Sequence, residues 1–326
     1  MSEISQNAVS GGIPAWQGRA VARALAVAIT AALVAMPFAA GGSWTYLLGV
    51  CFANSIGVLS VSVLVRYGGE VSIGHVFFVA AGAYAVAILE HRLGVSILVS
   101  APVAVILGVA LGIAFAWPSR SISGIYLAVS TMALALALPE LINNASSWTG
   151  GYEGLYVSLD LIPGAPKGLQ RYYLPLVALL AVAYALGCLR QSRQGIALLL
   201  ARSHPVAAEA FGITRGWARL SVMGISCGIA ALSGAMLAYA SSTVSPSGLT
   251  LWASIFLLVG SVVSLYGLTF LHAIVGGAFV TLIPQFLASA GAWIPVLYGV
   301  ALLGVILAGN LGPKLRDAVG RRRSRP

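Results

Sequence analysis

The stretch GGEVSIGHVFFVAAGAYAVAIL, residues 68–89, is a nearly unbroken apolar run that opens with glycines and carries one histidine. A run of about 20 apolar residues is long enough to cross a bilayer as a helix. The rest of the chain is similar, since 59% of its 326 residues are hydrophobic, 8% are charged and the mean hydropathy is +0.95. Soluble domains carry roughly 25% charged residues. The composition therefore predicts an integral membrane protein.

Ten such runs can be placed along the chain, so the predicted fold class is all-α, a polytopic transmembrane helix bundle. The predicted spans are 24–40, 45–65, 71–89, 95–116, 122–142, 172–189, 217–240, 251–268, 271–289 and 292–309. They leave an N-terminal tail (1–23), a transmembrane region (24–312) and a basic C-terminal tail (313–326). No room remains for a soluble domain.

The distribution of lysine and arginine predicts the orientation. With the N-terminus in the cytoplasm, fifteen of these residues fall inside and three outside. The inner set is Arg19, Arg23, Arg66, Arg120, Arg190, Arg193, Arg202, Arg215, Arg219, Lys314, Arg316, Arg321, Arg322, Arg323 and Arg325; the outer set is Arg92, Lys167 and Arg171. This bias predicts that both termini and the loop 190–216 are cytoplasmic and that the loop 143–171 is external. The net charge of +10 thus reflects topology, and nucleic acid is not an expected partner.

Several functional classes lack the residues that they need. The only lysines are Lys167 and Lys314, so the chain has no phosphate-binding G-x-x-x-x-G-K loop, and we expect no cofactor in it. The histidines and cysteines are not spaced as metal ligands, so no metal site is expected. An ion-coupled secondary carrier is the alternative function, although the carboxylates lie in loops, tails or span ends. An intramembrane protease built from Ser233 and His272 is a more distant alternative.

Five polar residues within the predicted spans are candidates for a translocation path: Asn54, His75, Tyr126, Ser130 and Thr131. Polar groups at membrane depth must face protein or water. His75 can also be a structural histidine at a helix entry, and hydroxyls in a helix can bond their own backbone. Asn54 has the weakest structural explanation, because an amide cannot face lipid cheaply. Both interpretations stay open.

The stretch RSHPVAAEAFGITRGWARL, residues 202–220, interrupts the apolar spans. Ser203 or His204 can cap a helix, Pro205 suits its first turn and Gly212 can end it. The resulting helix of about two turns is too short to be stable alone or to cross a membrane. We expect it to dock on a cytoplasmic partner, with an ordinary interfacial loop helix as the alternative.

Four blocks of sequence resemble a known family. SRQGIALLLARSHPVAAEAFGI (192–213) resembles the cytoplasmic loop of ABC-transporter permeases. YGGEVSIGHVFFVAAGAY (67–84), SGIYLAVSTMALAL (123–136) and WTGGYEGL (148–155) are similar to blocks of the branched-chain amino acid permeases, in the same order. The similarity is greatest to the larger of that system's two permease subunits.

The resemblance implies a permease subunit of an ATP-driven importer in the bacterial cytoplasmic (inner) membrane, not itself an enzyme. The implied partners are a second homologous permease, two ATPase subunits that bind ATP and Mg²⁺, and an external or periplasmic substrate-binding protein. The implied ATPase-coupling residues are Arg202, Ser203, Val206, Ala208, Glu209, Phe211 and Gly212. The implied substrates are branched-chain or other small amino acids, with urea and short amides as alternatives.

Overall fold

The computed structural model describes residues 28–38, 41–118, 125–157 and 164–286, together with the isolated positions 293, 296, 299, 300 and 303. The chain divides into two compact units, Met1–Gly41 and Gly42–Pro326. The described part of the first unit is the short apolar helix Ala28–Phe38. The second unit contains the other described helices and strands of the chain.

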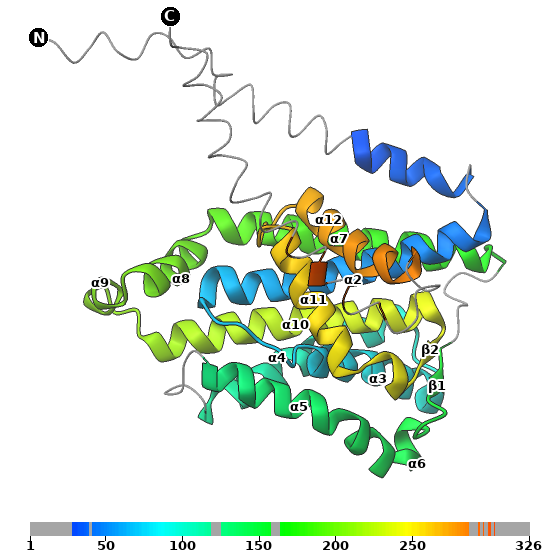
Figure 1. Ribbon diagram of the computed structural model, residues 1–326, viewed down its shortest axis with the longest axis horizontal. Coiled ribbons are helices and arrows are strands. Elements are labelled where there is room, and N and C mark those ends of the chain that lie inside the picture. The colour runs from blue at the N-terminus through cyan, green and yellow to red at the C-terminus, as the bar shows by residue number, and fades with distance from the viewer. Residues whose placement is uncertain are drawn as a thin grey trace, which may run out of the picture. The chain divides into compact units, whose positions relative to one another are not determined.

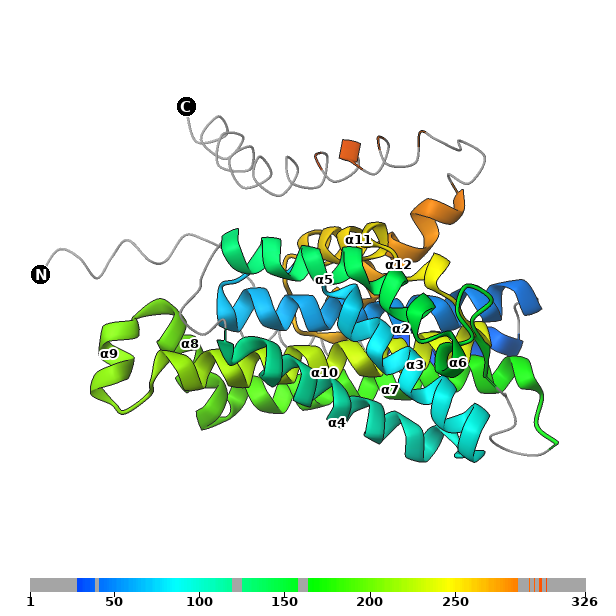
Figure 2. The same ribbon diagram turned by 90° about the horizontal axis from the view of Figure 1, so that it is seen from below.

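The second unit is a bundle of apolar helices (Figures 1 and 2). Its long helices are α2 (Gly42–Val63, continued by the π-helical turn η1, Leu64–Gly68), α3 (Val76–Leu93), α4 (Ile97–Ala116), α5 (Ile125–Asn144), α7 (Lys167–Gln191), α10 (Arg215–Ser241), α11 (Leu251–Val263) and α12 (Phe270–Phe286). Its short elements are α6 (Ser146–Thr149), β1 (Leu155–Tyr156), α8 (Arg193–Ser203), α9 (Pro205–Ala210), β2 (Thr243–Val244) and η3 (Pro246–Gly248). The mainly helical fold class is therefore confirmed.

Within the described residues, seven helical segments are long and apolar enough to cross a membrane. The predicted spans 24–40 and 271–289 correspond to shorter helices, Ala28–Phe38 and Phe270–Phe286. The tenth predicted span, 292–309, lies outside the described residues apart from five isolated positions, as do both predicted tails. The number ten and the cytoplasmic location of the termini thus stay predictions.

Helix α10 lies at the core of the bundle and packs against α2, α3 and α4. Small residues allow these helices to approach closely. A Cβ atom added to Gly82 of α3 would lie 2.0 Å from the carbonyl oxygen of Ala231, and one added to Gly234 of α10 would lie 1.8 Å from that of Val79. A larger residue at either glycine would therefore separate α3 from α10.

The connection between α2 and α3 corrects the predicted span 71–89, because α3 begins only at Val76 and residues 69–75 are not helical. The amide of Ile73 donates to Thr131 Oγ1 at 3.2 Å, and that of Val76 donates to Ser254 Oγ at 3.2 Å. A Cβ atom at Gly74 would lie 1.6 Å from the carbonyl oxygen of Thr131. Side chains of other helices thus satisfy two amides at the end of this connection, and hydropathy alone does not report such contacts.

The two ends of the bundle carry different loops (Figure 1). At one end lie α8, α9 and the first turn of α10. At the other, Arg92 donates to the carbonyl of Ser147 and stacks 5.0 Å from the Trp148 ring, and β1 pairs antiparallel with β2. This two-residue pairing is the described exception to the all-α prediction. The loops predicted to be cytoplasmic and external therefore lie at opposite ends, whereas the side of the membrane that each faces stays a prediction.

Candidate functional site

The loop between α7 and α10 contains the predicted short helix, α9. Pro205 occupies its first turn, and Gly212, with φ of 77°, ends it. The amide of Gly212 donates to the Glu209 carbonyl at 2.9 Å, and that of Ile213 donates to the Ala208 carbonyl at 3.0 Å. These bonds satisfy the last carbonyls of the helix, as a glycine terminator does. The predicted helix and its terminator are present.

The predicted cap of α9 differs. His204 holds the N-cap position without a side-chain hydrogen bond. The hydroxyl of Ser203 instead donates to the Leu199 carbonyl within α8, at 2.9 Å. The side-chain caps lie at the neighbouring helices, where Ser192 accepts from the Gly195 amide and Thr214 accepts from the Trp217 amide. Proline, with its fixed φ and absent N–H, therefore starts α9 without a cap.

Among the predicted coupling residues, Ala208 is buried and the other six are exposed. Val206 is 76% exposed and Phe211 is 78% exposed, so α9 presents apolar side chains outward. Glu209 forms an ion pair with Arg215 at 3.1 Å on the same exposed surface. Ala208 is buried, and Arg202 donates through Nη1 to the carbonyl of Arg66 in η1. Contact of any of these residues with an ATPase stays a prediction.

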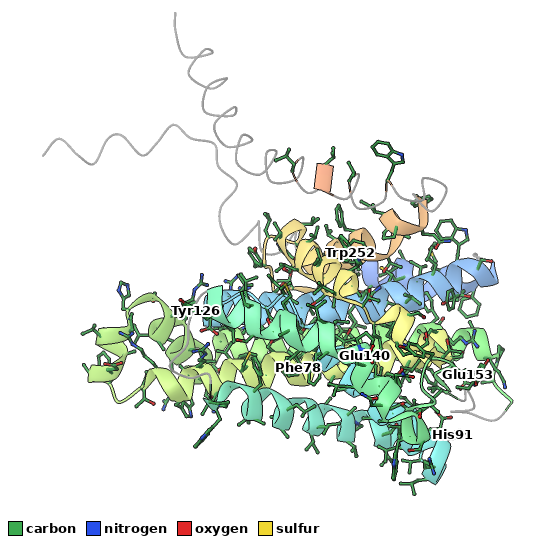
Figure 3. All side chains as sticks on the ribbon, turned by 60° about the horizontal axis from the view of Figure 1, so that its bottom comes forward. Phe78, His91, Tyr126, Glu140, Glu153 and Trp252 are labelled. Atoms are coloured by element: carbon green, nitrogen blue, oxygen red, sulfur yellow. The ribbon has the colours of Figure 1, made fainter. Side chains whose placement is uncertain are left out.

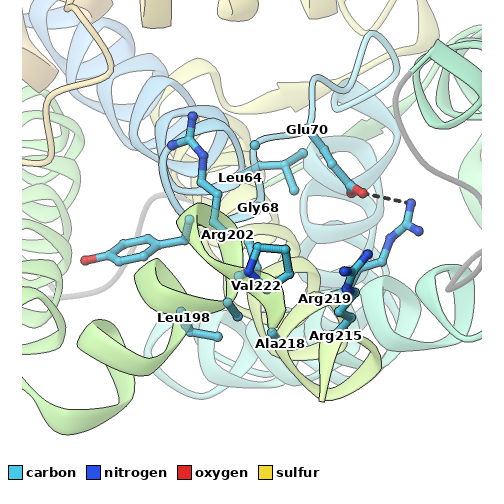
Figure 4. Close-up of a pocket in the computed structure, with 13 residues that line it drawn as sticks. Leu64, Gly68, Glu70, Leu198, Arg202, Arg215, Ala218, Arg219 and Val222 are labelled. Atoms are coloured by element: carbon cyan, nitrogen blue, oxygen red, sulfur yellow. Dashed lines mark ion pairs between the residues drawn. The ribbon is translucent and has the colours of Figure 1, made fainter. Parts of the chain in front are cut away.

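A pocket of about 650 Å³ lies at this end of the bundle, between η1, α8 and the start of α10 (Figure 4). We call it the arginine pocket, because its charged lining residues are Arg202, Arg215, Arg219 and Glu70. Arg219 Nη2 lies 3.1 Å from Glu70 Oε1, and these side chains are only 10% and 12% exposed. Burial raises the pKa of the Glu70 carboxyl above its ordinary value, and the Arg219 guanidinium partly offsets the rise.

A second cavity, of about 460 Å³, lies among α2, α3, α10, α11 and α12. We call it the apolar cavity, because most of its lining is aliphatic or aromatic and none of its described lining residues is charged. Its polar members include Asn54, Thr281 and Gln285. Asn54 Nδ2 donates to Thr281 Oγ1 at 2.9 Å. Asn54 thus faces protein and a cavity, as expected of an amide at membrane depth.

His75 and Thr131 lie in the packed interior instead. Both are 0% exposed. His75 Nε2 is 3.3 Å from the Ser226 hydroxyl, which donates its own hydrogen to the Ser60 carbonyl at 2.7 Å. Ser226 must therefore accept from His75, which assigns the proton of a neutral His75 to Nε2. Thr131 accepts from Ile73, so both residues hold the segment 69–75 in place.

The other two predicted path residues lie on α5 and line neither the arginine pocket nor the apolar cavity. Tyr126 is 74% exposed at the start of this helix (Figure 3), and Ser130 donates to the Tyr126 carbonyl at 2.7 Å. The structure therefore does not bring the five predicted path residues together. Of the five, only Asn54 lines the apolar cavity. Their roles in transport stay predictions.

Other polar residues of the apolar cavity, among them Thr281 and Gln285, were not predicted from the sequence. Gln285 lies within the predicted span 271–289 and is an amide, so the argument that selected Asn54 applies equally to it. Thr281 is 227 residues from its partner Asn54, and no local pattern joins the two. The Glu70–Arg219 ion pair was also not predicted, because the sequence does not show which charged loop residues are paired.

The proposed protease pair is not assembled. Ser233 is 1% exposed and donates to the Ala53 carbonyl at 2.8 Å. His272 is exposed, and its Nδ1 lies 2.6 Å from the Thr269 hydroxyl. Since each group bonds to another partner, they form no nucleophile and base.

Comparison with known proteins agrees with the resemblance seen in the sequence. Two curated relatives are the high-affinity branched-chain amino acid transport system permease proteins LivM of Escherichia coli (strain K12) and Salmonella typhimurium (strain LT2). Each is 26% identical over 273 residues, which cover 76% of this chain and 64% of the relative. The chain thus spans less than two thirds of the length of these relatives.

No solved structure matches the chain. The sequence model of a family described as the permease component of the branched-chain amino acid transport system matches residues 43–309. This range includes both cavities and the loop with α9. The chain therefore belongs to the branched-chain amino acid transport permease family.

Proposed function

We propose that this chain is the membrane-spanning permease subunit of an ATP-driven importer for branched-chain or related small amino acids. It forms the translocation path with a second, homologous permease in a bacterial cytoplasmic membrane. Two ATPase subunits bind ATP and Mg²⁺, and an external or periplasmic protein delivers the substrate. Members of the family are transport permeases, so hydrolysis is assigned to the ATPases rather than to this chain.

The family match over residues 43–309 carries this proposal. Helix α9 supports the ATPase partner, because it has only six residues and exposes Val206 and Phe211 at the tip of a loop. An isolated helix of this length is marginal in water, and large apolar side chains exposed on it suit a groove on another protein. The apolar cavity supports small apolar substrates, because its lining is uncharged and includes the Asn54 amide.

The test begins with purification of the tagged full-length chain from its native membrane, followed by identification of the proteins that co-purify. We expect an ATPase and a second permease. The complex is then reconstituted in proteoliposomes, with its binding protein outside and ATP inside, and uptake of labelled leucine is measured. Uptake that needs no ATP and follows an imposed proton or sodium gradient would instead establish the ion-coupled carrier.

A further inference from the structure

The arginine pocket contains a guanidinium whose hydrogen-bonding capacity is not used. Arg219 Nε and Nη2 have no hydrogen-bond partner among the described residues, although Nη2 lies 3.1 Å from Glu70. The side chain is nine-tenths buried. A guanidinium offers five N–H donors, and buried donors without partners are costly. The ion pair therefore compensates the charge of Arg219 without using these donors.

The pocket also has an excess of positive charge. Three arginines and one carboxylate line it, and Glu70 is already paired with Arg219. Arg215 is paired with Glu209, and both of those side chains are more than half exposed. Arg202 donates to a backbone carbonyl and has no ion-pair partner among the described residues. The pocket is thus suited to an anion with several acceptor oxygens.

The position of the pocket along α10 indicates the source of such an anion. Arg215, Trp217 and Arg219 lie in the first turns of this helix, before its long apolar stretch. Trp217 is 46% exposed. Tryptophan and arginine at the end of a span mark the level of the lipid headgroups. Basic pockets between helices on the cytoplasmic side are suited to phosphate headgroups.

We propose that the arginine pocket is a binding site for a phosphate group, supplied by an anionic phospholipid headgroup or by free phosphate. The pocket volume of about 650 Å³ accommodates a phosphate together with a headgroup. The guanidinium fork of an arginine matches two oxygens of a phosphate. A bound phosphate would connect Arg202 of α8 with Arg219 of α10, next to the loop that carries α9. The site goes beyond the proposed transport function and does not depend on it.

The test uses the full-length chain in detergent, titrated with phosphatidylglycerol, phosphatidylcholine or inorganic phosphate. Retained lipid is measured by native mass spectrometry and the melting temperature by fluorescence. We expect phosphatidylglycerol or phosphate, but not phosphatidylcholine, to bind and to stabilise the chain. Stabilisation by phosphatidylglycerol alone would identify a lipid headgroup as the source of the phosphate group. Stabilisation by inorganic phosphate would identify free phosphate. An equal response to all three ligands overturns the proposal.

Variants connect the binding to the pocket. Arg219→Gln and Arg202→Gln should each weaken anion binding by about five-fold, the effect of one arginine near a membrane surface. Arg193→Gln is the matched control, because Arg193 is exposed on α8 and does not line the pocket. Glu70→Gln removes the competing carboxylate, so it should bind the anion more tightly than the wild type. If Arg219→Gln does not fold, Arg202→Gln and Glu70→Gln still test whether the anion binds in the arginine pocket. Unchanged binding in both would refute the site.

Discussion

The arginine pocket and the apolar cavity differ in charge although both lie in the same bundle. The first is lined by three arginines and a glutamate at the α9 end. The second has amides and hydroxyls but no charged group among its described lining residues. Charges are costly in a low-dielectric interior, whereas hydrogen-bonded polar groups are tolerated. The chain therefore places charge at the end of the bundle and uses neutral hydrogen bonds within it.

One segment connects the two regions. Glu70, at the start of residues 69–75, lines the arginine pocket, and Val76, directly after them, lines the apolar cavity. At the C-terminal end of the segment, the side chains of Thr131 and Ser254 accept hydrogen bonds from backbone amides. Arg202 of α8 contacts the Arg66 carbonyl just before this segment. A displacement of α8 therefore reaches the cavity through one hydrogen bond and a short stretch of chain. The four predictions that follow test whether the two ends have separate roles and whether this segment joins them.

The largest expected effect is at Gly212. Its φ of 77° is unfavourable for a residue with a Cβ, and especially for a β-branched one. A Cβ atom here would meet nothing within 4 Å, so Gly212→Val changes backbone conformation without a clash. We expect normal membrane insertion but loss of ATPase co-purification, with leucine uptake reduced by about ten-fold or more.

Asparagine tolerates the left-handed conformation, so Gly212→Asn is the matched control and should retain most activity. Equal loss in both variants would mean that the side chain itself is harmful. Equal retention would mean that α9 need not end at this residue and would remove it from the coupling site.

The second prediction concerns the apolar cavity. Asn54→Leu removes the hydrogen bond to Thr281 and leaves that hydroxyl without its partner. Both residues are half-buried. A lost hydrogen bond costs about 1 kcal/mol, so uptake should fall roughly five-fold while ATPase co-purification is unchanged. Thr281→Val should have the same effect, and the double variant should be no worse than either alone. Asn144→Leu, at an exposed end of α5, is the control. Full uptake by Asn54→Leu would exclude the cavity from the path.

The helical, multi-pass fold was predictable from sequence because hydropathy depends on local composition. The start of α3 was not. The run from Val71 to Gly74 is apolar enough to continue a helix, yet Gly74 packs against the Thr131 backbone and Thr131 binds the Ile73 amide. These contacts join α3 to a helix about 60 residues away, and no window of local sequence contains both partners.

The same distinction applies to the candidate site. Pro205 and Gly212 lie only seven residues apart, and their backbone preferences predicted α9 and its end. The apolar cavity depends on Asn54 meeting Thr281, and the arginine pocket on Glu70 meeting Arg219. Tyr126 and Ser130 are the opposite failure of prediction. Both were predicted as path residues because they are polar, but on α5 they line neither cavity.

The third prediction tests the connecting segment. Thr131→Val removes the acceptor of the Ile73 amide and leaves a backbone donor unsatisfied, which should destabilise the protein by about 1–3 kcal/mol. Ser130→Ala is the adjacent control, because the Ser130 hydroxyl bonds only a carbonyl of its own helix. It should cost less than about 0.5 kcal/mol. Thermal unfolding of both variants in detergent makes the comparison. Similar losses would show that the Ile73 contact does not hold the segment.

The smallest expected effect is the pH dependence of Glu70. Burial raises its pKa in the folded protein, so the folded state binds this proton more tightly than the unfolded state does. The stabilisation from protonation is fully present below the ordinary carboxyl range and is lost as pH rises through the raised pKa. The charged and titratable groups that line the pocket with Glu70 are Arg202, Arg215, Arg219 and Tyr67.

The measurement is the difference in melting temperature between the wild type and Glu70→Gln, because other carboxyl groups titrate equally in both. As pH falls from about 7 to about 5, the wild type should gain on the variant by about 1–2 °C, less than a full kcal/mol. Added salt should change this difference little, since both side chains of the pair are nearly buried. If the wild type instead loses stability relative to the variant as pH falls, Arg219 outweighs burial and the pair is stabilised as ions. The arginine pocket would then already be neutralised from within, and the contrast in charge between the two cavities would be smaller than the lining residues suggest.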